Sequence, residues 1–215
     1  MKRRKIVIGD PHGCLVETEK ILELAEYNPA TDDVFFTGDL IHRGPDSKGC
    51  FTLMKKINAR AVLGNHELEH LLVKNGEWMK SERVNRSIAE FGDLYGFFLQ
   101  DIESWPLYIE DEDFTLIHAG LLPGKRPAEM TPREITSIRR IADPVNPKDR
   151  KPWFDYYTDP KLLLFGHWSQ LGGLDRPNCV GLDMGCVYGR TLRAIIMPER
   201  KIIDIQAEKQ YYVPS

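Results

Sequence analysis

The chain has 215 residues, a formal net charge of −3 and a sequence pI near 6.1. This balance gives no general basic field for nucleic acid, and no apolar run approaches the ~20 residues that a membrane helix needs. The basic cluster at 2–5 precedes an apolar run too short for a signal peptide. We therefore expect a cytoplasmic protein with no membrane contact, one domain over 1–215 and four reduced cysteines.

The first third of the sequence alternates short runs of β-formers with helical stretches. Such alternation is typical of parallel strands joined by crossover helices. We expect strands at 5–8, 34–37 and 60–63. We expect helices at 15–25, 46–57 and 67–74, with Asn65 capping the last of them.

A longer helical stretch is expected at 82–99. Two apolar strands at 107–109 and 114–118 then flank an acidic turn, which indicates an antiparallel hairpin. Residues 123–160 carry many prolines and charges with one expected helix at 132–141, so we interpret them as a loop-rich insertion on the substrate side. Four further strands are expected at 162–165, 178–182, 193–197 and 201–205.

Metal-binding side chains stand beside glycine just past several of these strands. Because sites in open α/β sheets gather beyond the carboxyl ends of strands, we expect these side chains to converge. Carboxylate, imidazole and amide ligands without cysteine suit Mn²⁺, Fe²⁺ or Zn²⁺, and glycine lets the chain turn sharply towards an ion. The pattern predicts a two-metal phosphoesterase site. The candidate ligands are Asp10, His12, Asp39, Asn65, His118 and His167.

The ligands divide between two ions. Asp10 and His12 are two residues apart, so an extended backbone places both on one side, where they would bind the first ion. Asp39 would bridge two ions ~3.5–4 Å apart, and Asn65, His118 and His167 would complete the second. A hydroxide held between the ions would attack phosphorus in line, without a covalent enzyme intermediate.

Other side chains are candidates for contact with the substrate. His66 is placed to protonate the leaving group, and the forked donors of Arg43 suit nonbridging phosphate oxygens. Arg139 and Arg140, on the expected helix at 132–141, could form a second phosphate clamp. Aromatic residues of the insertion could stack on an adenine or pack in the core. These are Trp153, Phe154, Tyr156 and Tyr157.

The segment from His66 to His70 also matches the zinc-protease pattern H-E-x-x-H, which makes a zinc metalloprotease a remote alternative. In that interpretation both histidines must lie within a helix, but the strand before Gly64 leaves His66 at the very start of one. It also leaves Asp10 and the other candidate ligands without a role. We therefore expect His70 to be structural and Glu67 to be an ordinary acid of the first helical turn.

Taken together, the motifs resemble the calcineurin-like metallophosphoesterases of the phosphoprotein phosphatase type. The resemblance extends over 9–189. It implies a four-layer α/β/β/α sandwich with mixed sheets and a dimetal centre. The segments that carry it are Gly9-Asp10-Pro11-His12-Gly13, Gly38-Asp39-Leu40-Ile41-His42-Arg43-Gly44, Gly64-Asn65-His66-Glu67, His118-Ala119-Gly120 and Gly166-His167.

Within that superfamily the chain is most similar to bacterial symmetrical bis(5'-nucleosyl)-tetraphosphatases, through the segments 38–47, 165–168 and 182–189. That likeness implies cleavage of diadenosine tetraphosphate to two ADP with two divalent ions, Mn²⁺ by expectation and Fe²⁺, Zn²⁺ or Co²⁺ as alternatives. A Ser/Thr protein phosphatase is the alternative function, and phosphoproteins or capped RNA 5' ends are the alternative partners. The chain departs from the superfamily at His42, where an aspartate usually orients the histidine equivalent to His66. The chain is also shorter than the usual tetraphosphatase, which implies trimmed loops.

Overall fold

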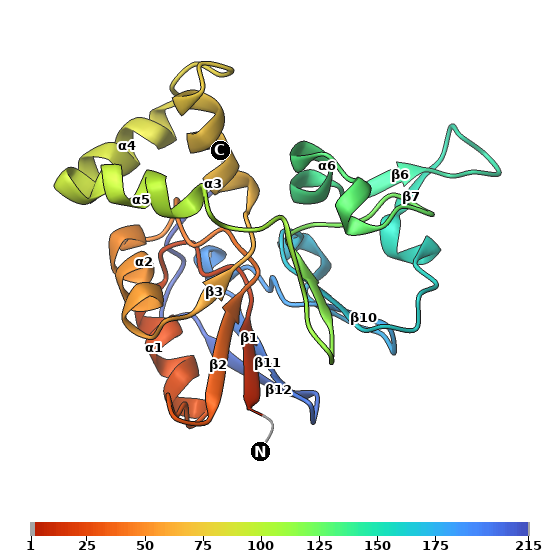
Figure 1. Cartoon of the computed structure of the whole chain (residues 1–215), viewed down its shortest axis with the longest axis horizontal. Coiled ribbons are helices and arrows are strands. Elements are labelled where there is room, and N and C mark those ends of the chain that lie inside the picture. The colour runs from red at the N-terminus through yellow and green to blue at the C-terminus, as the bar shows by residue number, and fades with distance from the viewer. Residues whose placement is uncertain (1–2, 215) are drawn as a thin grey trace.

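The computed structural model describes residues 3–214; residues 1, 2 and 215, with Lys2 of the basic cluster, lie outside it. Two five-stranded sheets form its centre (Figure 1). In the first sheet, three parallel strands are extended by two antiparallel ones. Its order is β12 (Lys201–Gln206), β11 (Thr191–Met197), β1 (Arg4–Ile8), β2 (Asp32–Phe36) and β3 (Arg60–Ala61).

The second sheet is also mixed. Its strands β5, β8 and β10 are parallel, whereas β4 and β9 pair antiparallel at the edges. The hairpin expected from the acidic turn is therefore confirmed as β4 and β5. The order is β4 (Tyr108–Glu110), β5 (Thr115–Ile117), β8 (Leu163–Phe165), β10 (Cys179–Gly181) and β9 (Leu174–Asp175).

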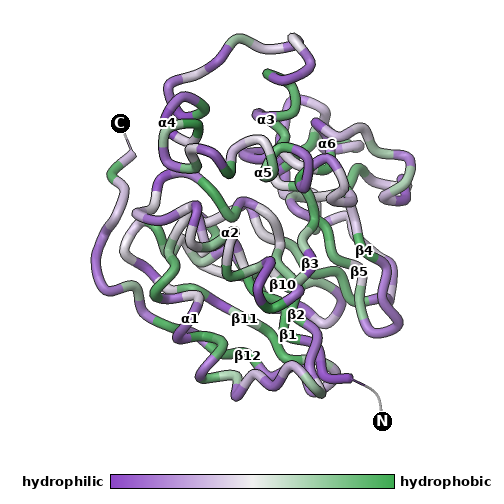
Figure 2. The backbone as a smooth tube through the Cα atoms, turned by 60° about the vertical axis from the view of Figure 1, so that its left-hand side comes forward, coloured by the Kyte–Doolittle hydropathy of each residue, from purple (hydrophilic) through white to green (hydrophobic). Residues whose placement is uncertain are grey.

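The two sheets pack face to face because side chains along a strand alternate between its two faces. On β1, Val7 joins the core between the sheets, whereas Ile6 and Ile8 join the core under the helices. On β8, Leu164 faces the first sheet, and Leu163 packs on the opposite side. Figure 2 shows the same division as hydrophobic strands at the centre and hydrophilic loops outside.

The helices of the first layer share the core on the outer face of the first sheet; the first two lie against that face, and the other three extend the layer beyond the ends of the strands (Figure 1). In chain order, the helices of this layer are α1 (Leu15–Leu24), α2 (Ser47–Lys56), α3 (Asn65–Lys74), α4 (Glu82–Phe91) and α5 (Tyr95–Ile102). The outer face of the second sheet is covered by α6 (Pro132–Ser137), by short 3-10 turns and by the hairpin of β6 (Arg140–Ala142) and β7 (Arg150–Pro152). The predicted four-layer α/β/β/α architecture is confirmed, with a thin fourth layer.

Three expected boundaries were wrong. The helix expected at 82–99 is two helices, because Gly92 takes a positive φ of 55° and ends α4. The helix expected at 132–141 ends at Ser137, because Ile138 is already extended. Asn65 is the first residue of α3 and not its cap; Gly64 precedes the helix, and its N–H is bound by the side chain of Glu67.

Two other expectations concern the whole described part of the chain. No helix between residues 3 and 214 combines the length and the apolar character needed to cross a bilayer. All four cysteines are buried and unpaired, as expected. They are Cys14, Cys50, Cys179 and Cys186.

Candidate metal centre

The candidate ligands follow strands of both sheets and meet at one place. Asp10 and His12 follow β1, Asp39 follows β2, and His118 and His167 follow β5 and β8. Two groups of ligand atoms form there: His12, Asp39 and His66 in one, and Asp39, His118 and His167 in the other. Within each group the atoms lie within 4.8 Å of one another, and Asp39 belongs to both.

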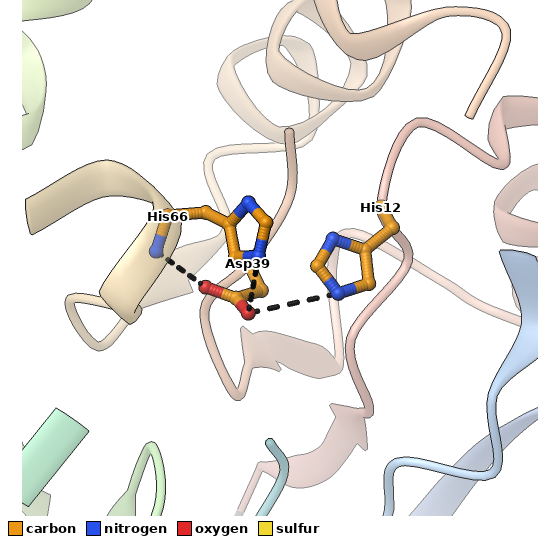
Figure 3. A group of neighbouring side chains, drawn as sticks. All are labelled: His12, Asp39 and His66. Atoms are coloured by element: carbon orange, nitrogen blue, oxygen red, sulfur yellow. Dashed lines mark hydrogen bonds and ion pairs between the residues drawn. The ribbon is translucent and has the colours of Figure 1, made fainter. Parts of the chain in front are cut away.

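Asp39 lies at the centre of the site, with one oxygen surrounded by imidazole rings. Its Oδ2 lies 3.6 Å from His12 Nε2, 3.5 Å from His118 Nε2 and 3.9 Å from His66 Nε2. Its Oδ1 accepts the backbone N–H of His66 at 3.0 Å, as Figure 3 shows together with the contacts to the His12 and His66 rings. Burial alone would raise the pKa of Asp39, but the surrounding histidines lower it, so this carboxylate is held in its charged form.

Backbone carbonyls orient two of the histidines. The Nδ1 of His12 donates to the carbonyl of Ile41 at 2.9 Å, and the Nδ1 of His118 donates to the carbonyl of Thr37 at 2.7 Å. Because a carbonyl can only accept, the proton of each ring is on Nδ1 and the lone pair of Nε2 faces Asp39. This is how metal-binding histidines are usually held.

Asn65 connects the two histidines of the second group. Its Oδ1 lies 3.0 Å from His118 Nε2 and 2.8 Å from His167 Nδ1. The other ring nitrogen of His167, Nε2, is buried and has no hydrogen-bond partner. Asn65 Oδ1, His118 Nε2 and His167 Nδ1 therefore converge here, whereas Nε2 lies on the other side of the His167 ring.

Asp10 contributes a second buried carboxylate. Its Oδ1 accepts the hydroxyl of Thr37, and its Oδ2 accepts the N–H of His167 at 2.7 Å. Burial, Asp183 and Asp39 raise the pKa of Asp10 well above its usual value. Three carboxylates so close together repel one another, and a bound cation would relieve that repulsion.

Asp183 was not identified from the sequence, although it follows β10 as the candidate ligands follow their strands. It is buried and accepts the N–H of Gly185 at 2.9 Å, and burial raises its pKa to about 6. Its position after a strand was the one available indication, but a single aspartate without an adjacent histidine or second motif is weak evidence.

The interpretation of Glu67 as an ordinary first-turn acid was wrong. Its side chain is fully buried and accepts three backbone N–H groups, those of Asp39 at 2.9 Å, Leu40 at 2.9 Å and Gly64 at 3.2 Å. Asp39 has a φ of 49°, in the left-handed region that costs a non-glycine residue about 1–3 kcal/mol. Glu67 therefore holds the strained turn that directs Asp39 into the site.

At two positions only glycine fits, because the neighbouring side chains leave no room for a Cβ atom. A Cβ at Gly64 would lie 2.3 Å from Asp39 Oδ1, and a Cβ at Gly166 would lie 1.9 Å from Asp10 Oδ1. From the sequence we expected glycine to let the chain turn sharply after each strand. At these two positions its missing side chain instead lets a neighbouring segment approach a candidate ligand.

The geometry does not support the protease alternative. The ring of His42 lies between the two histidines of the H-E-x-x-H segment, with Nδ1 2.6 Å from His66 Nδ1 and Nε2 3.0 Å from His70 Nε2. These nitrogens face another imidazole and not a shared ion position. Glu67, the general base of that interpretation, is occupied by the three backbone N–H groups.

The arginines differ in where the structure places them. Arg43 Nη1 lies 2.7 Å from His12 Nε2, and Arg139 Nη2 donates to the carbonyl of His167 at 2.9 Å, so both border the site. Arg140 begins β6; its guanidinium lies over the ring of Trp168 and bonds the carbonyl of Arg150. The structure therefore does not bring Arg140 against the candidate ligands, and it corrects the placement of both arginines on one helix.

The aromatic side chains of the insertion lie mainly in the core. Trp153 and Phe154 are buried and pack on Phe165. Trp168 packs against the same group, close to His167 in sequence. The structure therefore favours core packing over adenine stacking for Trp153 and Phe154.

Comparison with known proteins agrees with this geometry. The calcineurin-like phosphoesterase family profile matches residues 4–190. A symmetrical bis(5'-nucleosyl)-tetraphosphatase of Dechloromonas aromatica (strain RCB) is 26% identical, with 96% of this chain and 97% of the relative covered. The enzyme of that name from Actinobacillus pleuropneumoniae serotype 3 (strain JL03) is 29% identical, with 91% and 96% covered.

Comparison with solved structures also finds a protein named for tetraphosphatase activity. A protein provisionally named a diadenosine tetraphosphatase superposes with a TM-score of 0.82 at 28% identity, covering 96% of this chain and 95% of that one. The alignment to the Dechloromonas relative runs over 270 positions, more than the 215 residues of this chain, so that relative has segments without a counterpart here. By its profile match the chain belongs to the calcineurin-like phosphoesterases, and it is a hydrolase of that family.

Proposed function

We propose that the chain is a two-metal phosphoanhydride hydrolase that cleaves dinucleoside tetraphosphates symmetrically into two nucleoside diphosphates. The observation that carries the proposal is the position of Asp39, whose Oδ2 lies between two proposed ligands, 3.6 Å from His12 Nε2 and 3.5 Å from His118 Nε2. A shared carboxylate is what a pair of ions about 3.5–4 Å apart needs as its bridge. The names of the relatives supply the substrate class.

The donor set fits two divalent ions. Asp10, His12 and Asp39 would hold one ion; Asp39, Asn65, His118 and His167 would hold the other. The Nδ1 of His167, which faces Asn65 Oδ1, and the two Nε2 lone pairs that face Asp39 support this assignment. When bound, the ions would supply Lewis acidity at the phosphoryl group and activate water as the nucleophile. Mn²⁺ is the ion we propose from the resemblance to the tetraphosphatases, and the oxygen and imidazole donors also accept Fe²⁺, Zn²⁺ or Co²⁺.

Arg43 and Arg139 would hold the phosphate chain from two ends of the site. Arg43 reaches the His12 end and lies near the rings of Tyr188 and Tyr212, at 5.7 Å and 6.0 Å from their centroids. Arg139 reaches the His167 end, and burial lowers its pKa even though Asp183 and Asp39 raise it. A planar guanidinium at each end can bind nonbridging oxygens of different phosphates.

Two cavities continue outward from these arginines. One, of about 250 Å³, is lined by Arg43, Arg83, Arg86 and Tyr212 and also by Glu82 and Glu90, and Arg86 is paired with Glu82. The other, of about 580 Å³, is lined by Arg139, Arg140, Arg150 and Trp168 among others. A substrate with a nucleoside at both ends of its phosphate chain needs room and positive charge on both sides of the reacting phosphorus. The pair of cavities therefore favours a dinucleoside polyphosphate over a phosphomonoester.

His66 would protonate the leaving nucleoside diphosphate. Its ring is buried beside Asp39 and His12, and its Nε2 lies toward the carboxylate at the centre of the site. A nucleoside diphosphate is a much better leaving group than an alkoxide, so the need for an acid is moderate.

The test compares substrates under one set of conditions. Mn²⁺-loaded protein should turn over diadenosine tetraphosphate with a kcat/KM at least 100-fold above that for a phosphoserine peptide, and Asp39→Asn should abolish both activities. Faster hydrolysis of the phosphopeptide would instead assign the chain as a Ser/Thr protein phosphatase. Hydrolysis of a capped RNA 5' end, measured under the same conditions, tests the remaining class of substrate.

A further inference from the structure

A continuous chain of hydrogen-bonding groups runs from the proposed site to α5. His66 Nδ1 lies 2.6 Å from His42 Nδ1, His42 Nε2 lies 3.0 Å from His70 Nε2, and His70 Nδ1 lies 2.9 Å from the hydroxyl of Tyr95. The three histidines are at most 5% exposed, whereas Tyr95 is half-buried. The four side chains come from the loop after β2, from α3 and from α5.

The arrangement of protons along this chain follows from counting. Burial lowers the pKa of His42 and lowers that of His70 to about 4, so both rings are neutral and carry one proton each. Each nitrogen pair can hold only one proton, so the direction of the first hydrogen bond fixes all the others. Burial raises the pKa of Tyr95, so its hydroxyl stays protonated. A phenol can donate or accept, and we take it as the donor to His70 because the proton of His66 then lies on Nε2, the nitrogen nearest the carboxylate of Asp39.

With Tyr95 as the donor, the tautomers follow in order. His70 accepts at Nδ1 and donates from Nε2; His42 accepts at Nε2 and donates from Nδ1; His66 accepts at Nδ1. The only position left for the proton of neutral His66 is Nε2, the nitrogen that lies 3.9 Å from Asp39 Oδ2. A ring nitrogen that carries a proton cannot bind a metal ion, so this arrangement reserves His66 for donation to substrate.

We propose that His42, His70 and Tyr95 act as a positioning relay that fixes the ring of His66 and keeps its proton on Nε2, facing the reacting phosphate. This inference rests on the proposed function, in which His66 protonates the leaving group. It gives His42 a role in place of the aspartate of the superfamily, and it gives His70 a role beyond structure.

Protons can move along the relay in such a way that no imidazole ring is left charged. When His66 Nε2 passes its proton to the leaving oxygen, His66 Nδ1 takes the proton of His42. His42 Nε2 takes the proton of His70, and His70 Nδ1 takes the proton of Tyr95. The phenol oxygen then regains a proton from solvent water, which half-buried Tyr95 can reach, and the proton lost by the attacking water neutralises the hydroxide that remains. The reverse shift, with protonation of His66 Nε2 by solvent after the product leaves, restores the starting tautomers. Without the relay, neutral His66 would be left as an imidazolate anion.

A purely structural role for His70 is the competing explanation, because its ring also packs on Phe98 with centroids 5.5 Å apart. A double-mutant cycle separates the two explanations, since residues in one network show non-additive effects. His42→Asp would place a carboxylate beside His66 Nδ1, which in this variant carries a proton and donates it to the carboxylate, so His70 is unnecessary for orientation. His70→Leu removes the relay and keeps apolar volume against Phe98.

The relay predicts a specific pattern of rates with diadenosine tetraphosphate. In the wild-type background, His70→Leu should lower kcat by about 10–100-fold and change KM less than twofold, as expected for a lost partner of a catalytic histidine. In the His42→Asp background the same change should cost less than twofold. Equal losses in both backgrounds would overturn the relay, because a packing defect does not depend on residue 42.

The hydroxyl of Tyr95 has a matched control. Tyr95→Phe should lower kcat by about 3–10-fold, within the range for loss of one orienting hydrogen bond. Tyr27→Phe removes a tyrosine hydroxyl that bonds the carbonyl of Ile57, outside the relay, and should leave kcat unchanged. Equal effects of the two substitutions would contradict the proposal.

A readout independent of turnover distinguishes failure of the relay from failure of the proposed function. The chain has six histidines, so ¹⁵N spectra of histidine-labelled protein can be assigned by substitution. The relay predicts the Nε2–H tautomer for His66 and His70 and the Nδ1–H tautomer for His42. These tautomers without hydrolysis of any phosphoanhydride would refute the proposed function alone, whereas an Nδ1–H tautomer at His66 would refute the relay whatever the activity.

Discussion

Substitution of Gly166 tests whether the position of Asp10 matters to the site. In Gly166→Ala the new Cβ would lie 1.9 Å from Asp10 Oδ1 and 2.7 Å from Thr37 Oγ1. Ordinary contact begins at 3.4 Å, so the carboxylate must move by roughly 1.5 Å, and a displacement of about 1 Å at a site can cost about 100-fold in rate. We therefore expect kcat to fall by about 100-fold or more.

The cost to stability should be smaller than the cost to activity. Overpacking of this kind typically costs about 1–3 kcal/mol, so the protein should stay folded at 25 °C. The assay combines urea unfolding, calorimetric titration with Mn²⁺ and turnover of diadenosine tetraphosphate. We expect weaker ion binding together with the loss of rate, because Asp10 is a proposed ligand.

Gly96→Ala is the matched control. Gly96 is exposed on α5, and a Cβ there would meet nothing within 4 Å. This substitution should leave activity unchanged and stabilise the helix by up to about 1 kcal/mol. If Gly166→Ala kept ion affinity and kcat within twofold of wild type, the assignment of Asp10 as a ligand would be refuted.

Three further substitutions test separate parts of the account. Asp39→Asn keeps the shape but removes the shared charge, so calorimetry should find fewer than two Mn²⁺ ions and kcat should fall by about 1,000-fold; two tightly bound ions would contradict the bridging role. Arg43→Lys should lower kcat/KM by about 10–100-fold, since an ammonium cannot bind two oxygens in a fork; wild-type kinetics would exclude a bidentate clamp. Asp32 is bound by Arg4 Nη2 at 2.6 Å and by Asn28 N at 2.9 Å, and although its burial would raise the pKa, these partners lower it. The charged Asp32 carboxylate therefore stabilises the folded state above the ordinary carboxyl pKa, and this stabilisation is lost as the pH falls through the lower pKa that Asp32 has in the folded protein. Between pH 5 and 2 the Tm should thus fall less steeply in Asp32→Asn than in wild type. Parallel Tm curves would show that this pair contributes nothing to acid unfolding.

Much of the fold was predictable because hydrophobic runs and turn residues agree along the chain. The strands that precede Asp10 and Asp39 are short, end in three apolar residues and reach a glycine within two residues, a pattern that favours buried parallel strands. The convergence of the six candidate ligands follows from that topology. The helix boundaries at Gly92 and Ile138 were missed because an apolar pattern continues past each, although a glycine with a positive φ ends α4 and the backbone becomes extended at Ile138.

The roles of Glu67 and Asp183 could not be predicted for a different reason. Glu67 accepts N–H groups from residues 27 and 28 positions away, so its role exists only once β2 and α3 lie side by side. The relay through His42 likewise needs α3 and α5 in contact. The sequence does show His42, His70 and Tyr95, but no spacing rule places them in one chain of hydrogen bonds.

The most direct test of the account is the product distribution from diadenosine tetraphosphate, separated by ion-exchange chromatography after incubation with Mn²⁺-loaded protein. We expect ADP as the sole nucleotide product, and we expect it to be lost in Asp39→Asn and on removal of the ions with a chelator. AMP with ATP, or turnover that survives chelation, would contradict symmetrical cleavage at a two-metal site built around Asp39.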